Sequence, residues 1–235
     1  AANIRSFGKN EVINPFETFA ERLAMAVHSP GLYALHDWMT GVPHETLREP
    51  PFPSQGLWIM AGYGQFGKVL YRHLQNAGIQ VQIVETDPVG NHAPSGTLTG
   101  SGTEAPTLLD AGLMHAVGII AGTHDDANNL SILLTARELN PGIFVVARQN
   151  QRDNDRIFAC AGFDLIMKRG DVIAHKIFAL LRTPLISDFL AAIKLHDNAW
   201  VNILISRILG ICDNEVPYLW EIKINKARTP ALYSA

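Results

Sequence analysis

The feature that most constrains this chain is a glycine-rich turn between an apolar run and an amphipathic segment. Residues 57–61, Leu-Trp-Ile-Met-Ala, lead directly into Gly62-Tyr63-Gly64-Gln65-Phe66-Gly67, and apolar residues then recur at helical spacing over residues 66–77. The pattern predicts a strand, a tight turn and a helix. In such a unit Gly62 permits the turn, Gly64 lets a phosphate approach the backbone, and Gly67 lets the helix pack on the strand.

An acidic residue follows where a nucleotide-binding turn of this kind needs one. Glu85 ends the next predicted strand, residues 79–85, about 20 residues after the glycines, where a carboxylate binds ribose hydroxyls. A carboxylate there repels a 2′-phosphate, which favours NAD or an adenine mononucleotide over NADP. Thr86 and Asp87 come next, and Asp87 is an alternative ribose ligand. The phosphates would bind at the N–H groups that begin the helix. The alternative to nucleotide binding is that the glycine turn serves only for packing.

Alternation of strands and helices continues to Lys168. Further strands are predicted at residues 96–100, 117–121, 144–147 and 165–167, with helices at 107–111, 126–139 and 153–161. Six strands with helices between them predict an α/β, Rossmann-like, doubly wound and mainly parallel sheet over residues 55–168.

Polar residues come after two of the other predicted strands. Gly122, Thr123, His124 and Asn128 follow residues 117–121, and Arg148 follows residues 144–147. Both sets belong at the carboxyl edge of the sheet, on the ligand side. Capping of the next helix by Thr123 or Asp125 is an equal alternative for the first set. For Arg148 the alternatives are a phosphate contact and an ordinary surface arginine.

The flanking segments predict helices. Residues 1–54 are expected to hold a helix that Asn14 caps and Pro15 begins, a second helix at 32–39 after Ser29-Pro30-Gly31, and a proline-rich linker at 41–55. Residues 169–235 predict helices at 172–181 and 186–195, an ambiguous apolar stretch at 200–209 and a strand at 220–224. The segment 11–32 echoes the segment 171–186, which suggests the tail of a preceding copy of the same unit.

Composition narrows the function classes. The 235 residues carry a net charge of −3 with scattered basic residues, which argues against a nucleic-acid partner. We find no bilayer-spanning apolar run and no secretory signal, so a soluble, reduced, cytosolic chain is expected. The two cysteines, Cys160 and Cys212, and the nine histidines form no metal motif. We predict no metal site and no catalytic residue. His124 could act as a catalytic base, but a histidine in a loop is more often an ordinary polar surface residue. The ends of the chain suggest a piece of a longer protein.

Five motifs in order resemble the TrkA-N family, the RCK or KTN domains that regulate potassium conductance. They are the glycine turn with the strand that ends at Glu85, and the stretches Leu109-Asp110-Ala111-Gly112-Leu113, His124-Asp125-Asp126-Ala127-Asn128-Asn129, Val145-Val146-Ala147-Arg148 and Ala161-Gly162-Phe163-Asp164. The resemblance spans about residues 58–190. It implies a nucleotide sensor on the cytoplasmic side of the cell membrane that takes NAD(H) or an adenine nucleotide such as AMP or ADP.

The resemblance also implies partners. Family members form homodimers, through sheet-edge helices and a crossover helix that resembles residues 170–181 here, and larger gating rings on a potassium channel or transporter membrane domain. Two positions depart from the family pattern. Gln65 stands where many members have an arginine that reaches the terminal phosphates, which weakens the case for ATP. Ser101 stands where many have the aspartate near adenine, so the adenine contact is altered. The alternatives are an NAD-dependent oxidoreductase fragment and a non-binding assembly copy. The predicted cofactor-binding residues are Gly62, Tyr63, Gly64, Gln65, Phe66, Gly67, Glu85, Thr86, Asp87, Ser101, Gly122, Thr123, His124, Asn128 and Arg148.

Overall fold

The computed structural model describes residues 13–46, 53–182, 186–193, 195–196, 198–212, 215–219, 227 and 229. These residues divide into two compact units. The first unit holds the described residues up to Tyr33 and those from residue 53 to Ala174, and the second holds residues 34–46 and the described residues from His175 onward.

The first unit is built on one sheet of six parallel strands. The strands are β1 (Leu57–Ala61), β2 (Gln80–Glu85), β3 (Leu98–Thr99), β4 (Gly118–Ala121), β5 (Phe144–Gln149) and β6 (Leu165–Lys168). They lie in the order β3-β2-β1-β4-β5-β6, and every neighbouring pair is parallel. The predicted doubly wound α/β fold is therefore confirmed. The strand order reverses between β1 and β4, which is where a crevice opens at the carboxyl ends of the strands in such a sheet.

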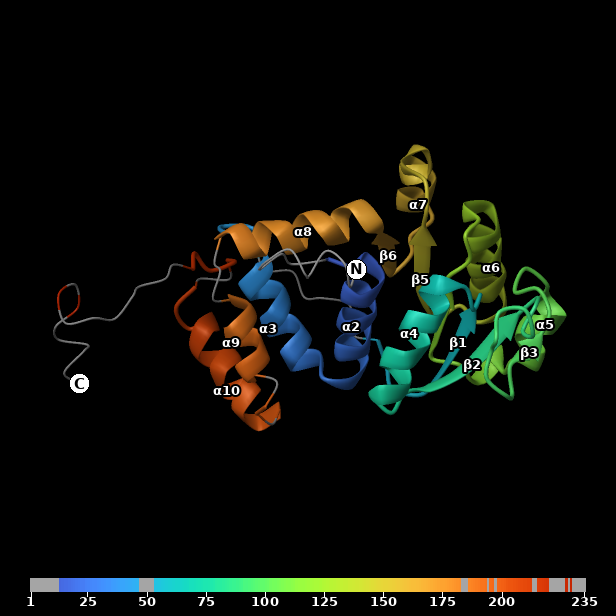
Figure 1. Cartoon of the computed structure of the whole chain (residues 1–235), viewed down its shortest axis with the longest axis horizontal. Helices are drawn as coiled ribbons and strands as arrows, with labels where there is room; N and C mark the ends of the chain where they lie inside the picture. Colours follow the sequence, from blue (N-terminus) through green and yellow to red (C-terminus); the bar gives the residue numbers. More distant parts are fainter. Residues whose placement is uncertain are drawn as a thin grey trace, which may run out of the picture. The chain divides into compact units, whose positions relative to one another are not determined.

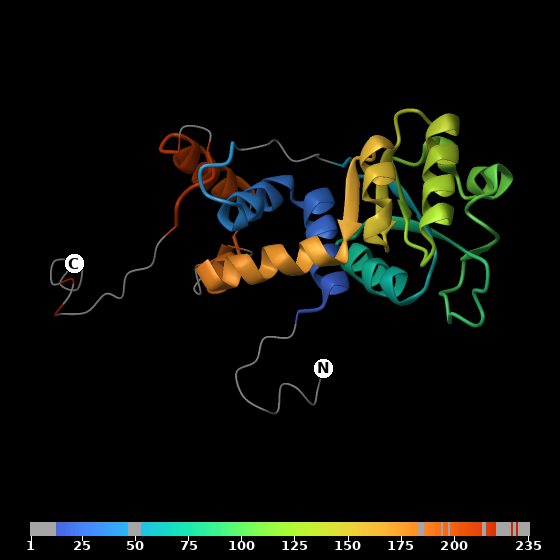
Figure 2. The ribbon, with the colours of Figure 1, turned by 90° about the horizontal axis from the view of Figure 1, so that it is seen from above.

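Helices cover both faces of this sheet. α2 (Pro15–His28) and α4 (Gln65–Asn76) pack on one face, and α5 (Ala105–Asp110), α6 (Asp126–Leu139) and α7 (Asp155–Cys160) pack on the other. Figure 1 shows these layers, and Figure 2 separates α4 from α6 in a view from above. The two faces bury separate apolar clusters, because alternate residues of each strand point to opposite sides of the sheet.

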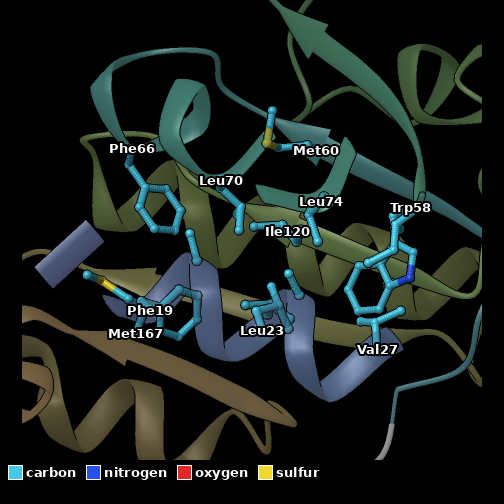
Figure 3. Close-up of a cluster of buried hydrophobic side chains, with 14 of the residues drawn as sticks. Phe19, Leu23, Val27, Trp58, Met60, Phe66, Leu70, Leu74, Ile120 and Met167 are labelled. Atoms are coloured by element: carbon cyan, nitrogen blue, oxygen red, sulfur yellow. The ribbon is translucent and has the colours of Figure 1, made fainter. Parts of the chain in front are cut away.

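Helix α2 is part of the core of this unit. Asn14 caps it by accepting a hydrogen bond from the Phe16 N–H at 3.0 Å, as the sequence predicts. Its buried stripe of Phe19, Leu23 and Val27 points toward α4 and the strands, as Figure 3 shows. Glu17 adds an ion pair with Arg72 at 2.5 Å and a hydrogen bond with His73 at 2.7 Å across the α2–α4 contact.

Several boundaries differ from the sequence prediction. The helix expected at residues 153–161 is a 3-10 turn at Arg152–Asn154 followed by α7, and the weak strand at 96–100 is reduced to β3. A further 3-10 turn, η1 (Leu113–His115), precedes β4. None of the helices within the described ranges combines the length and apolar character that a membrane crossing requires.

The second unit is helical. It contains the C-terminal parts of α3 (Pro30–Thr40) and α8 (Arg169–Arg182), together with α9 (Ile186–Ile193) and α10 (Asn198–Leu209). α3 begins at Pro30 rather than at residue 32, since proline suits the first turn of a helix, and the ambiguous stretch at 200–209 is helical. Thr46, in the expected linker, forms an isolated antiparallel bridge with Glu215. The strand expected at 220–224 lies outside the described residues.

Candidate functional site

A cavity of about 600 Å³ opens at the carboxyl ends of β1, β2, β4 and β5. We call it the carboxyl-edge pocket. It lies at the point where the strand order reverses, which is the usual ligand position in a doubly wound sheet. Its lining residues come from strand ends, the loops after them and the helices α2, α4, α6 and α8: Phe16, Ala61, Gly62, Gly64, Gln65, Val84, Glu85, Thr86, Asn91, Gly100, Ser101, Gly102, Thr103, Gly122, Thr123, His124, Asn128, Ile132, Arg148 and Arg169.

The glycine turn forms the floor of this pocket. Gly62 has a φ of 100°, which favours glycine, and its N–H donates to the Val84 carbonyl at 2.9 Å. Gly64 is the N-terminal cap of α4, and an added Cβ there would meet no atom within 4 Å. A Cβ at Gly67 would overlap the carbonyl oxygen of Gly62. Each glycine therefore has the role expected of it: turn, open approach and close packing.

Glu85 joins the end of β2 to the glycine turn. One carboxylate oxygen accepts a hydrogen bond from the Tyr63 N–H at 2.5 Å, and the other accepts from the Thr86 hydroxyl at 3.0 Å and the Asp87 N–H at 3.1 Å. Burial opposes the charged form, but these hydrogen bonds outweigh it and hold the pKa of the Glu85 carboxyl below its ordinary value. The pocket therefore presents a fixed negative charge close to the open space at Gly64.

Asp87 turns away from the pocket. Its carboxylate accepts a hydrogen bond from the Gly90 N–H at 2.9 Å, within the loop after β2. Of the two acids that the sequence offers for ribose, only Glu85 lines the pocket. Tyr63, Phe66 and Gly67 also lie outside its lining, because Tyr63 contributes its backbone N–H, Phe66 is buried in the core, and Gly67 faces the Gly62 carbonyl.

A polar network ties the ends of β4 and β5 together. Asn129 is fully buried; its side-chain oxygen accepts from the Thr123 N–H at 3.0 Å and the Thr123 hydroxyl at 2.7 Å, and its amide donates to the Arg148 carbonyl at 2.8 Å. Asp125 caps α6 by accepting from the Asn128 N–H at 2.7 Å. Capping therefore falls to Asp125, while Thr123, His124 and Asn128 line the pocket.

Asp126 anchors the loop after β5. Its two oxygens accept hydrogen bonds from the Asn150 N–H and side-chain amide, the Gln151 N–H and the Asn154 amide, at 2.7 to 3.0 Å. Burial raises its pKa, but these donors outweigh burial and the net shift is below the ordinary value. Asp126 thus positions the loop that follows Arg148 rather than facing a ligand.

Arg148 extends from β5 into the pocket. One guanidinium nitrogen donates to the Gly122 carbonyl at 3.2 Å, and the buried Nε has no hydrogen-bond partner within the described residues. Its guanidinium carbon lies 5.1 Å from the ring centroid of Phe16 and 5.4 Å from that of Phe66. Burial, and next the positive charge of Arg169, lower the pKa of Arg148. This geometry places a cation in the pocket that makes no ion pair with a carboxylate among the described residues.

The same region matches one family model. Residues 58–168 match the TrkA-N domain model. The match begins in β1 and ends with β6, so it covers the whole sheet, and the TrkA-N resemblance of the sequence motifs is confirmed.

Several known proteins are similar to parts of this chain. Potassium channel protein 1 of Methanocaldococcus jannaschii is 30% identical over 97 residues, covering 39% of this chain and 29% of the relative. Probable potassium channel protein 2 of the same organism is 27% identical over 141 residues, covering 57% and 41%. A crystal structure of GsuK bound to ADP has a TM-score of 0.53 at 21% identity, covering 80% of this chain and 42% of that one, and shows likeness of fold. The chain thus spans less than half the length of each of these proteins.

Sequence reasoning missed part of the TrkA-N pocket. Phe16 precedes the domain match, and Arg169 follows it directly after β6. Asn91 and Thr103 lie in the loops after β2 and β3. A position just beyond a strand end is the one signal that could have found Arg169. No group of three or more histidines, cysteines or acids that could hold a metal ion occurs in the part of the chain that the structure describes.

Proposed function

We propose that this chain is a nucleotide-sensing regulatory module of a potassium channel or potassium transport system. The observation that carries the proposal is the carboxyl-edge pocket, in which an open glycine turn, a fixed carboxylate and a cation converge. The helix N-terminus at Gly64 and the guanidinium of Arg148 suit phosphates, and Glu85 suits ribose hydroxyls. NAD(H), AMP or ADP meets these three requirements.

The choice among nucleotides follows from the charges that line the pocket. Glu85 disfavours a 2′-phosphate, so NADP is a poor ligand. Gln65 supplies no positive charge at the turn, which leaves Arg148 and Arg169 to neutralise phosphates. Two guanidinium groups suit the two phosphates of NAD or ADP better than the three of ATP. The GsuK structure of similar fold, which is bound to ADP, supports the same ligand class.

Regulation would act through assembly. We propose that the chain works as a homodimer or within a gating ring, attached to a membrane pore and facing the cytoplasm, without catalysis of its own. The similar M. jannaschii channel proteins support this setting. In this proposal residues 55–168 bind the nucleotide, residues 1–54 form the N-terminal helical segment and linker, and residues 169–235 form the crossover and helical extension. A nucleotide that binds two arrangements of the paired domains with different affinity would shift the pore between states.

Calorimetric titration of the whole chain with NAD, NADH, AMP, ADP and ATP, with light scattering of the same samples, tests the proposal. Gly64→Asp places a carboxylate over the N–H groups of α4 and should abolish binding, since the backbone conformation of Gly64 suits any residue and the space beside it is open. Gly142→Asp is the matched control, because a Cβ at Gly142 also meets no atom within 4 Å. Equal binding by both variants, or no binding by the unaltered folded chain, would reject a sensor at this pocket and favour an assembly copy.

A further inference from the structure

Phe16 brings helix α2 into the carboxyl-edge pocket. It lies in the first turn of α2, outside the TrkA-N match of residues 58–168. Its ring lines the pocket and packs edge-on against Phe66, with centroids 5.4 Å apart. One side chain therefore serves both as a docking contact of α2 and as part of the wall around the ligand space.

Two arginines lie over the ring of Phe16. The guanidinium carbon of Arg148 is 5.1 Å from the ring centroid, and that of Arg169 is 5.7 Å away. Both distances are within the range of cation–π attraction. The two arginines come from different places in the fold, the end of β5 and the start of α8, and Phe16 is the group that they share.

Neither of these two cations has a carboxylate at ion-pair distance among the described residues. Asp126 exerts an attraction on Arg148, but both of its oxygens are occupied by amide donors. Like charges that share one site repel each other. An anion bound between the two guanidinium groups would remove that repulsion and hold both against Phe16.

We propose that an anionic nucleotide in the pocket and the docking of α2 on the sheet strengthen each other through Phe16. The inference rests on the proposed function, since it requires a phosphate-bearing ligand. Coupling between two events is reciprocal: if bound ligand favours docked α2 by some factor, docked α2 raises ligand affinity by the same factor. A variant that removes the coupling therefore loses this factor from both events. Helix α2 is thereby the element that reports occupancy of the pocket to the residues that precede the domain.

Hydrogen exchange of the whole chain, measured with and without saturating NAD, AMP or ADP, reads the docking of α2 directly. We expect ligand to slow exchange of the α2 amides by about 5-fold or more, the lower range of allosteric coupling. Phe16→Leu keeps an apolar contact of similar volume but removes the aromatic face. It should abolish the slowing and weaken nucleotide binding by about the same factor.

Val27→Ala is the matched control within the same helix. Val27 is buried in the contact with α4 but is not part of the pocket lining, so this variant should keep both the ligand-induced slowing and the nucleotide affinity. Nucleotide binding without slowing, or an unchanged affinity in Phe16→Leu, overturns the coupling and leaves the proposed function intact. Equal loss of slowing in both variants also overturns it, because general loosening of α2 would then suffice. Absence of any binding by the folded chain rejects the proposed function first.

Discussion

Replacing Gly118 with alanine would force a methyl group against the buried indole of Trp58. Gly118 begins β4 and pairs with Trp58 of β1. An added Cβ would lie 2.6, 2.6 and 2.7 Å from three carbons of the six-membered ring, and Trp58 is fully buried. Carbon atoms pack at about 3.5–4.0 Å, so the strand or the ring must move by about 1 Å. Overpacking costs about 1–3 kcal/mol, and alanine regains about 0.5–1 kcal/mol over glycine in a strand. We expect a net destabilisation of about 1–2 kcal/mol.

Urea unfolding followed by circular dichroism measures this difference. Gly142→Ala is the control, because its Cβ would meet no atom within 4 Å, and its stability should stay within about 0.5 kcal/mol of wild type. Trp58→Phe removes the ring that the methyl group strikes. The destabilisation of the double variant Trp58→Phe with Gly118→Ala should therefore be smaller than the summed destabilisations of the two single variants by at least about 0.5 kcal/mol. Additive effects, or a Gly118→Ala chain as stable as the control, would refute the reasoning.

Three further predictions concern the pocket and its supports. Asp126→Asn should lower the free energy of unfolding by about 1–3 kcal/mol at neutral pH. Because the folded pKa of Asp126 lies below its ordinary value of 3.8, this difference should persist above about pH 4 and shrink as the pH falls through the folded pKa. Urea midpoints that keep a constant difference down to low pH would contradict this prediction. Asn129→Leu leaves the Thr123 N–H and the Arg148 carbonyl without buried partners and should lower stability by about 2–3 kcal/mol; a melting temperature equal to that of wild type would exclude the role assigned to Asn129. Gly67→Ala overlaps the Gly62 carbonyl and should lower both thermal stability and nucleotide affinity, whereas Gly64→Ala should lower affinity alone, as calorimetry with parallel melting curves can test.

The fold could be predicted from the sequence because its signals are local. The apolar run of β1, the glycine turn and the stripe of α4 follow one another directly, and each has a distinct spacing. Glu85 is identified by its place at the end of the second strand. Short elements were placed less well, since β3 has two residues and its pairing depends on β2 rather than on its own composition.

The rest of the pocket depends on contacts between distant residues. Phe16 reaches the pocket because α2 packs on α4, which no pattern near residue 16 indicates. Asp126 and Asn129 look alike in sequence, because both are polar residues after a strand. The partners of Asp126 lie on the loop after β5, whereas those of Asn129 lie at the ends of β4 and β5. A carboxylate at a strand end can bind a ligand or anchor a loop, and only the position of its donors decides between these roles.

The packing of α2 changes what should be regarded as the transferable piece of this protein. Leu23 and Val27 shield Trp58, Leu70 and Leu74 from water, although the family match begins only at residue 58. Expression of residues 58–168 alone would leave an apolar surface exposed to water, which favours self-association. A transfer of this domain into another chain should therefore include the helix that begins at Pro15. The apolar core to which α2 contributes is therefore larger than the range that the family match delimits.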